Sequence, residues 1–190
     1  MASIKDQQLL YHLTSLANLG SIFDKGLQPR SALSDFYDVA DAEILTSRKS
    51  QGLDDYVPFH WFARNPFDGR VQQDRPDEDF VLITVRRSVA RGRNWKVISR
   101  HPLAKEAPEL LDYAAGFDLI DWVTMDARDY KDTNGKSVCM AECLSPNAVA
   151  VADFFMIYVR TEKAEGVVTG EIERRSLSLG VTVNGNMFNK

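Results

Sequence analysis

The sequence has little cysteine and no long hydrophobic run. Cys139 and Cys143 are its two cysteines, too few for a disulfide framework. No apolar run approaches the roughly 20 residues that a membrane-spanning helix needs. The opening residues, MASIKDQQ, are polar and do not resemble a secretory leader. These absences predict a cytoplasmic protein with no membrane segment.

Metal ligands and nucleotide-binding glycine loops are scarce as well. The chain has three histidines, none of them close in sequence to a cysteine. We therefore interpret both cysteines as core residues that face away from Glu142 on the same strand. No carboxylate cluster suited to Mg²⁺ stands out. Neither GxGxxG nor GxxxxGK[ST] occurs, which argues against a Rossmann or P-loop site. We expect no bound metal.

Acidic residues are missing from one stretch, residues 80–105. The chain as a whole carries a formal net charge of −4, so no global field attracts nucleic acid. A local run of one sign can nevertheless follow a phosphate backbone, or it can be an ordinary solvated surface. The run contains Arg86, Arg87, Arg91, Arg93, Lys96, Arg100 and Lys105.

What is present is the composition of one globular domain over residues 1–190, with 44% hydrophobic and 26% charged residues. The apolar patterns predict strands at 8–16, 56–63, 80–87, 95–100, 137–149 and 148–160 and an extended C-terminal tail. Helical spacing is found at 16–27, 38–48 and 108–123, whereas 65–79 and 129–137 have the composition of loops. This pattern predicts an α+β fold with an antiparallel or mixed sheet.

One carboxylate lies where a charge is costly. Glu142 is in the middle of a short apolar strand, between Met140 and Leu144. A charge buried in such a strand costs several kcal/mol unless something pairs with it. Glu142 is therefore either neutralised by a partner or retained for chemistry.

Other polar residues are weaker candidates. His12 and Thr14 share one face of a predicted strand and could hold a ribose or a carboxamide, or could be satisfied core residues. Arg48 could bind a diphosphate or lie on the surface. Arg64 and Arg70 flank aromatic residues, an arrangement that suits stacking on unpaired bases or plain core packing.

The order of these segments resembles the DarT family, toxins that ADP-ribosylate bases of single-stranded DNA with NAD. The family's opening pattern is matched by YHLTSLANLGSIFDKGL, residues 11–27. Its arginine and Val-Pro-Phe segment are matched by SRKSQGLDDYVPFHWFARNPF, residues 47–67. IDW, AECLS and VTVNGNMFN are similar to its later motifs, so that the match runs nearly end to end.

The resemblance implies an ADP-ribosyltransferase fold, in which two abutting split β-sheets and flanking helices surround an NAD cleft. It implies that Glu142 is catalytic together with Arg48, with Arg30 as the alternative arginine. It also implies NAD as co-substrate, no metal, and a cognate antitoxin as partner. The implied NAD-binding residues are His12, Leu13, Thr14, Ser21, Leu27 and Arg48. On this view Glu142→Ala lowers transfer by several orders of magnitude and leaves folding intact.

The chain departs from the family in the segment that faces the target. It has ARNPFDGRV where Arg-Ser-Pro-Met-Leu-Tyr is usual, and His60 where tyrosine is common. Thymidine or guanosine in single-stranded DNA is the first expectation, and RNA bases are the alternative. The expected nucleic-acid contacts are His60, Arg64, Arg70, Arg86, Arg87, Arg91 and Arg93.

Two further classes of function stay open from the sequence. A catalytically silent binding module would keep the fold without Arg48 and Glu142, which this chain retains. A protein-directed ADP-ribosyltransferase often has Glu or Gln two residues before the catalytic glutamate, where this chain has Met140.

Overall fold

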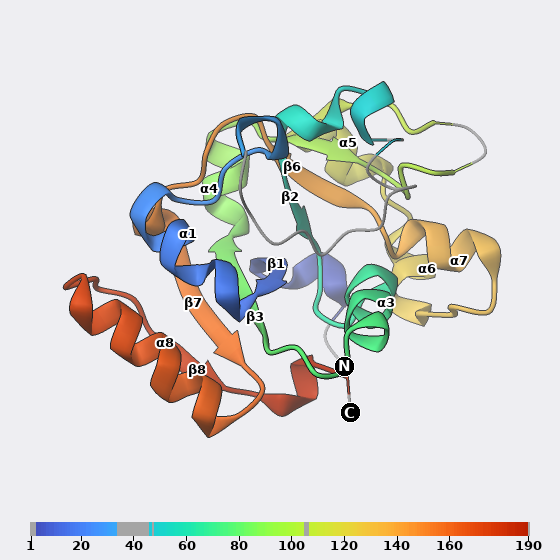
Figure 1. Cartoon of the computed structure of the whole chain (residues 1–190). Helices are drawn as coiled ribbons and strands as arrows, with labels where there is room; N and C mark the ends of the chain where they lie inside the picture. The colour runs from blue at the N-terminus through green and yellow to red at the C-terminus, as the bar shows by residue number, and fades with distance from the viewer. Residues whose placement is uncertain (1–2, 34–45, 47, 105–106, 190) are drawn as a thin grey trace.

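The computed structural model describes residues 3–33, 46, 48–104 and 107–189 (Figure 1). The described part of the chain contains one mixed sheet, whose strands run in the order β5-β4-β6-β2-β1-β3-β7-β8. In chain order these are β1 (Leu9–Ser15), β2 (Val57–His60), β3 (Phe80–Arg86), β4 (Lys96–Ile98), β5 (Leu111–Asp112), β6 (Glu142–Ser145), β7 (Phe154–Val159) and β8 (Val181–Val183).

Seven α-helices lie entirely within the described residues: α1 (Leu19–Lys25), α3 (Pro66–Asp74), α4 (Arg87–Gly92), α5 (Tyr113–Leu119), α6 (Trp122–Ala127), α7 (Thr133–Val138) and α8 (Glu162–Arg174). Short 3₁₀ turns lie at Ile4–Asp6, Leu16–Asn18, Arg30–Ala32, Leu53–Asp55, Val151–Asp153 and Gly185–Met187. The predicted α+β class is therefore confirmed. None of the described helices is long and apolar enough to cross a membrane.

The sheet has a narrow waist between β1 and β2. These two antiparallel strands are registered at one residue pair, Tyr11 with His60. By contrast, β1 and β3 are registered along seven residue pairs, from Leu9 with Arg86 to Ser15 with Phe80. The two abutting sheets that the resemblance implies are thus two four-stranded halves of one sheet, which separate on either side of this pair.

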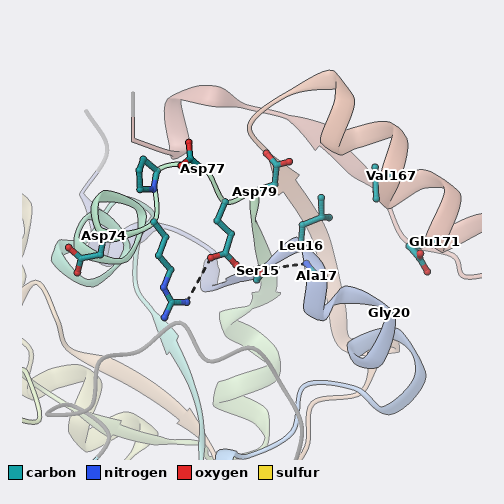
Figure 2. A pocket seen from close by; sticks show the side chains of 12 residues that line it. Ser15, Leu16, Ala17, Gly20, Asp74, Asp77, Asp79, Val167 and Glu171 are labelled. Carbon is teal, nitrogen blue, oxygen red and sulfur yellow. Dashed lines mark hydrogen bonds and ion pairs between the residues drawn. The ribbon is translucent and has the colours of Figure 1, made fainter.

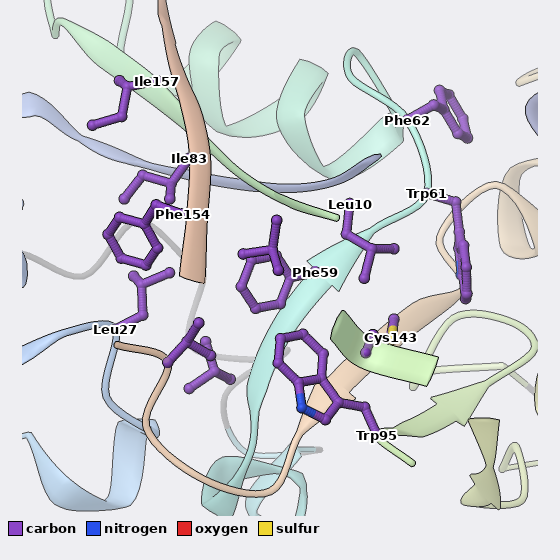
Figure 3. Close-up of a cluster of buried hydrophobic side chains, with 14 of the residues drawn as sticks. Leu10, Leu27, Phe59, Trp61, Phe62, Ile83, Trp95, Cys143, Phe154 and Ile157 are labelled. Carbon is purple, nitrogen blue, oxygen red and sulfur yellow. The ribbon is translucent and has the colours of Figure 1, made fainter. Parts of the chain in front are cut away.

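The two faces of the sheet are covered unequally. Residues such as Leu10, Phe59 and Cys143 face the main core (Figure 3). Side chains from α1, α4, α5, α6, α7 and α8 complete that core. The opposite face carries Leu13 and Leu82, which pack with Val71 of α3 and with the C-terminal Phe188. This alternation follows from the two-residue period of a strand.

Two segments predicted as loops are helices. At 65–79, Asn65 begins α3 by accepting a hydrogen bond from the Asp68 backbone N–H at 3.0 Å, and Pro66 at the first position needs no amide donor. At 129–137, Asp132 caps α7 in the same way through the N–H of Gly135. Glycine is needed at position 135 because the backbone of Asp129 lies close to it: a Cβ on Gly135 would lie 2.6 Å from the Asp129 carbonyl oxygen. Turn-forming residues in both segments are helix caps.

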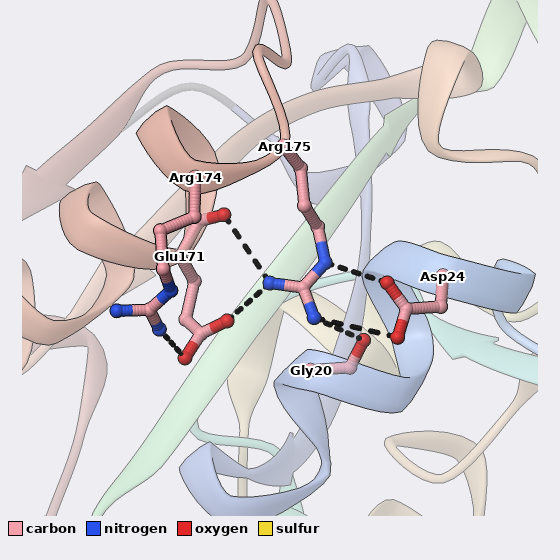
Figure 4. A network of polar contacts seen from close by, with 5 residues as sticks. All are labelled: Gly20, Asp24, Glu171, Arg174 and Arg175. Atoms are coloured by element: carbon pink, nitrogen blue, oxygen red, sulfur yellow. Dashed lines mark hydrogen bonds and ion pairs between the residues drawn. The ribbon is translucent and has the colours of Figure 1, made fainter.

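The C-terminal region contains α8, which the sequence analysis did not predict. It connects β7 to β8, the parallel strand pair of the sheet, because parallel strands need a crossover connection. Arg175, at its end, bonds to Asp24 of α1 and Glu171 of α8 (Figure 4). These contacts hold α8 and α1 together on the same face.

The predicted helix over 38–48 lies outside the described residues except for Thr46 and Arg48, which are helical. The remaining strand predictions correspond to β1, β2, β3, β4, β6 and β7, each shorter than predicted. Cys143 is on β6, but Cys139 ends α7 and does not share the strand with Glu142. Both cysteines are buried and free.

Candidate active site

A buried ion pair joins the two residues that the sequence singled out for catalysis. Arg48 Nη1 donates to Glu142 Oε2 at 2.6 Å, and each side chain is 8% exposed. Arg48 Nη2 also donates to the Leu53 carbonyl at 3.2 Å. The partner that Glu142 requires is therefore Arg48, which lies 94 residues away in sequence. Charge-assisted bonds of this kind offset the cost of burying both groups.

Glu142 begins β6 beside the waist of the sheet. It pairs with His60 of β2 on one side and with Ile98 of β4 on the other. Directly opposite residues of antiparallel strands point to the same face. The carboxylate and the imidazole of His60 therefore share the face that α3 covers, whereas Cys143 points to the main core.

His60 is deeply buried, with 6% of its surface exposed. Its ring lies 5.5 Å from the Phe67 ring, centroid to centroid, at an interplanar angle of 30°. Burial lowers the pKa of His60 to about 4, against the opposing effect of the Glu142 charge. The imidazole is thus neutral and hydrogen-bonds the Ala141 backbone, and its Nδ1 is fully buried.

The side chain of His12 on β1 contacts the backbone of β2 where the two strands separate. Its Nδ1 lies 2.7 Å from the Pro58 carbonyl oxygen. Burial lowers the pKa of His12, while the bond to Pro58 opposes the shift. Thr14, two residues further on, accepts a hydrogen bond from the Asn18 side chain at 3.2 Å. Because β2 is registered with β1 only at Tyr11, residues 12–14 are paired with β3 and not with β2.

The other predicted NAD contacts differ in accessibility. Ser21 is exposed on α1. Leu27 is 4% exposed and packs in the main core, and its N–H and carbonyl both bond to Val149. Arg30 is close enough to Arg48 for the two charges to interact, and burial lowers its pKa. Arg48, and not Arg30, pairs with Glu142.

Arg87 contradicts its assignment to a nucleic-acid surface. It is 5% exposed, and its guanidinium donates to backbone carbonyls at 2.8–3.1 Å and lies over the Trp61 ring. The four acceptors are the carbonyls of Ile4, Lys5, Leu9 and Trp61. Arg87 is a structural residue that attaches the N-terminal turn to the sheet.

Several other residues of the basic run over residues 80–105 contact acidic or aromatic residues from other segments. Arg93 forms a double hydrogen bond with Asp153, at 2.6 and 2.7 Å. Lys96 bonds to Asp112, and Arg86 lies 3.9 Å from the centre of the Phe155 ring. Arg91 is exposed. Tertiary contacts therefore pair Arg93 and Lys96 with carboxylates that lie outside the run in sequence.

Arg64 and Arg70 are exposed at the two ends of a short segment. Arg64 has a left-handed backbone, with φ 60°, and its N–H donates to Asp68 Oδ2 at 3.0 Å. Tyr130 donates to the Arg64 carbonyl at 3.1 Å, which joins this segment to the loop before α7. Arg70 pairs with Asp74 on α3.

The sequence analysis missed Arg128 and Tyr130. Arg128 is exposed, also has a left-handed backbone, and lies 4.7 Å from the centre of the Phe62 ring. An arginine and a tyrosine in a polar segment shortly before Glu142 were a usable signal. The contact with residues 62–64, which brings them beside the other arginines, could not be read from the chain.

A groove whose lining includes neither Arg48 nor Glu142 is acidic (Figure 2). It lies between the segment after α3, the start of α1 and α8. Its carboxylates are those of Asp74, Asp77, Glu78, Asp79 and Glu171. Such a lining repels a polyanion, so a nucleic acid would approach from another side. The described residues contain no cluster of three or more metal ligands.

Comparisons with known proteins fit this geometry. A family model described as "DarT: ssDNA thymidine ADP-ribosyltransferase, DarT" matches residues 11–189. The chain belongs to the DarT family. It is therefore an NAD-dependent ADP-ribosyltransferase of the family that modifies thymidine in single-stranded DNA, as the resemblance implied. Comparison with curated protein sequences gave no significant match.

Solved DarT structures share the fold at low sequence identity. Thermus sp. 2.9 DarT in complex with ADP-ribosylated ssDNA is 17% identical with a TM-score of 0.81, covering 96% of each chain. The same DarT in complex with NAD⁺ is 17% identical with a TM-score of 0.79, covering 97% of this chain and 98% of that one. Thermosipho africanus DarTG in complex with ADP-ribose is 19% identical with a TM-score of 0.75, covering 96% of this chain and 51% of that one.

Proposed function

We propose that this chain transfers ADP-ribose from NAD to thymidine in single-stranded DNA, with release of nicotinamide, as the toxin of a toxin–antitoxin pair in the cytoplasm. The observation that carries the proposal is the buried Arg48–Glu142 pair at the waist of the sheet. Residues 1–190 act as one domain in this proposal. NAD and ADP-ribosylated DNA occur with DarT from Thermus sp. 2.9, and DarTG of Thermosipho africanus is the family precedent for a partnered toxin.

Glu142 is the proposed catalytic carboxylate. Breaking the bond between nicotinamide and ribose builds positive charge on the anomeric carbon. A carboxylate stabilises that charge best where water is excluded, and Glu142 is 6% exposed. Arg48 fixes the orientation of the carboxylate through their hydrogen bond and is placed to meet the diphosphate of NAD.

The residues of β1 that follow its single pair with β2 would hold NAD. His12, Leu13 and Thr14 follow the single β1–β2 pair, so the backbone there is free of β2. Ser21 is exposed on the nearby helix α1. A neutral His12, fixed by its bond to Pro58, suits an uncharged group such as the carboxamide, because a charged imidazole would repel the cationic nicotinamide ring.

The target nitrogen follows from the chemistry of thymine. Within a nucleotide, N3 carries the one N–H of the thymine ring, so N3 is the nitrogen that can accept ADP-ribose. The bond from N3 to the anomeric carbon forms as the bond to nicotinamide breaks. Nicotinamide leaves as a neutral molecule, and the N3 proton passes to the Glu142 carboxylate, which acts as general base.

The strand that carries the target would be held by exposed arginines. Arg64, Arg70 and Arg91 are exposed, and we add Arg128 because it lies beside Phe62, close to Arg64 in sequence. Arg86 and Arg93 remain candidates for phosphate contacts, although aromatic and acidic neighbours engage them. Arg87 is left out because it is buried and fully engaged.

The test is transfer of label from NAD to oligonucleotides of defined base, in DNA and RNA, followed by mass spectrometry. Wild type is expected to label thymidine in single-stranded DNA, and Glu142→Gln to lower transfer at least about 100-fold. Glu173→Gln, on the exposed side of α8, is the matched control. Label on RNA alone would replace the DNA target, label on protein alone would replace the target class, and no label would indicate a binding module.

A further inference from the structure

Two exposed arginines from distant parts of the sequence lie near the same tyrosine. Arg64 directly precedes the cap of α3, and Arg128 directly follows α6. Both guanidinium charges act on the Tyr130 hydroxyl, whose pKa burial raises to about 12. Within the described part of the chain neither guanidinium has an ion-pair partner. Like charges gathered in this way repel each other, and a bound anion relieves the repulsion.

The carboxylates near this arginine pair are engaged by backbone groups. Asp68 Oδ2 accepts from the Arg64 N–H at 3.0 Å. Asp129 accepts from the Lys131 N–H at 3.0 Å, and Asp132 caps α7. Burial raises the pKa of Asp68 to about 7, so that this group carries only part of its charge at neutral pH. These acids shape the two segments and leave the guanidiniums to another anion.

The backbone of both arginines is held in a conformation that side chains disfavour. Arg64 has φ 60° and Arg128 has φ 50°, in the left-handed region. Asp68 holds the Arg64 N–H, and Tyr130 donates to the Arg64 carbonyl at 3.1 Å. The Arg128 guanidinium lies 4.7 Å from the centre of the Phe62 ring, which orients its plane. Residues held in strained conformations by their surroundings cluster at ligand sites.

The arginine pair is close in sequence to the strand that faces the catalytic carboxylate. Arg64 follows His60 by four residues, and His60 is directly opposite Glu142. Four residues span at most about 14 Å. Phe67 of α3 packs on the His60 ring at 5.5 Å, so the intervening segment returns toward that strand. An anion bound by the pair is therefore close to a nucleotide whose base reacts beside Glu142.

We propose that Arg64 and Arg128 together bind one backbone phosphate of the target DNA strand, and that Tyr130 is the positioning residue that sets the distance between them. This inference rests on the proposed function. Planar guanidiniums bind phosphate oxygens through paired N–H donors, and phosphate contacts fix the register of a strand. Tyr130 joins the two segments, because its hydroxyl bonds to Arg64 and its backbone lies two residues from Arg128. Since Arg48 is placed to meet the diphosphate of NAD, the phosphate at the arginine pair comes from DNA.

Neutral replacements test whether the two arginines act as one site. Arg64→Gln and Arg128→Gln should each weaken binding of a single-stranded oligonucleotide about 10-fold, measured by fluorescence anisotropy. The double variant should lose much less than the product of the two effects, because both side chains hold the same phosphate. Its slope of log Kd against log salt should fall by about 0.7, the value for one phosphate of a single strand. Arg160→Gln, at an exposed site after β7, is the matched control.

Tyr130→Phe keeps the ring and removes the hydroxyl. It should raise KM for the oligonucleotide and remove most of the coupling between Arg64 and Arg128. The value of kcat and KM for NAD should stay unchanged, and so should the free energy of unfolding in urea, which separates positioning from a general loss of structure. Unchanged coupling in Tyr130→Phe would overturn the positioning role.

The decisive experiment locates the phosphate. Oligonucleotides with a single dT carry a neutral methylphosphonate at one linkage at a time. Wild type should lose affinity about 10-fold at one linkage near the dT, and the double arginine variant should be insensitive to that linkage. Undiminished sensitivity in the double variant, fully additive losses, or an effect confined to KM for NAD would overturn the shared phosphate site. Binding without transfer by wild type would instead overturn the proposed function, while the anisotropy series would still test the site.

Discussion

At the scale of single residues, Arg48 and Glu142 are costly to bury and depend on each other. Removing one partner of a buried ion pair leaves an uncompensated charge and costs about 3–5 kcal/mol. Arg48→Met should lower the free energy of unfolding by that amount in urea titrations. Arg48→Met combined with Glu142→Leu should recover most of it, since two apolar side chains replace the pair. Equal losses in the single and double variants would contradict the coupling.

The same pair corrects one expectation from the sequence. Glu142→Ala would leave the buried Arg48 guanidinium without its carboxylate, so we now expect that variant to lose stability as well as activity. Glu142→Gln, which retains an acceptor for Arg48, is the better test of chemistry. The sequence revealed both residues, because motif order marks them, but it could not reveal that they bond in the free protein. That contact depends on packing across 94 residues of chain.

The Arg87 misassignment has a physical cause. From the sequence, a basic run of one sign gives no information about which side chain turns inward. In the structure, Arg87 begins α4 and donates to four backbone carbonyls. Arg91, four residues later on the same helix, is exposed. A run of basic residues in sequence therefore predicts a charged surface only for those residues whose side chains point to solvent.

Arg87→Lys should therefore be strongly destabilising, although lysine retains the positive charge. An ammonium has no planar fork to reach four carbonyls, and each buried acceptor left unsatisfied costs about 1–3 kcal/mol. We expect a loss of about 2–4 kcal/mol in the free energy of unfolding, measured by urea denaturation. Arg91→Lys is the matched control and should change it by less than about 0.5 kcal/mol. Similar values for the two variants would refute the anchoring role.

At the scale of elements, α3 shows how a segment of loop composition becomes a helix. The Asn65 side chain accepts from the Asp68 N–H and donates to the Phe62 carbonyl, while Asp68 accepts from the Arg64 N–H. Turn residues and N-caps have the same composition, so the sequence alone could not separate them. The strands were easier to predict, because β-branched runs such as FVLITV have no competing interpretation.

Asn65→Ala should cost about 1–2 kcal/mol of stability, the upper part of the range for a lost N-cap. The amide is 1% exposed, so water cannot replace both of its bonds. Asn65→Ser keeps an acceptor for the Asp68 N–H and should restore part of the loss. Thermal unfolding of the three proteins checks this order. A serine variant no better than the alanine variant would show that the cap bond contributes little.

At the scale of the whole molecule, the C-terminal segment closes the face that carries Glu142 and His60. Phe188 is 1% exposed and packs with Leu13, Val71 and Leu82. Asn189 bonds to Gln72 and Gly69 of α3. Phe188→Ala should cost about 3–5 kcal/mol in urea denaturation. Val183→Ala, at an exposed site on β8, should cost much less; equal costs would show that Phe188 does not close this face.

Two buried groups on this face should give the molecule opposite responses to pH. Burial lowers the pKa of His60 to about 4 and raises the pKa of Asp68 to about 7. Below pH 6.5 the unfolded chain protonates His60 before the folded chain does, so this group lowers stability as pH falls, by on the order of 3 kcal/mol at pH 4. Asp68 is protonated first in the folded chain, so between pH 7 and 4 it raises stability as pH falls.

Single variants should separate these opposing contributions. Arg48 and Glu142 also act on His60, and Tyr130 and the N–H groups of Arg64 and Asn65 face Asp68. Relative to wild type, His60→Phe should gain stability as pH falls from 6.5 to about 4. Asp68→Asn should lose stability relative to wild type over pH 7 to 4, since the isosteric amide keeps the bond to Arg64 but cannot take up a proton. Urea titrations at several pH values measure both slopes. A pH-independent difference for either variant would mean that its group titrates alike in the folded and unfolded chains, and that burial in this face imposes no electrostatic cost on it.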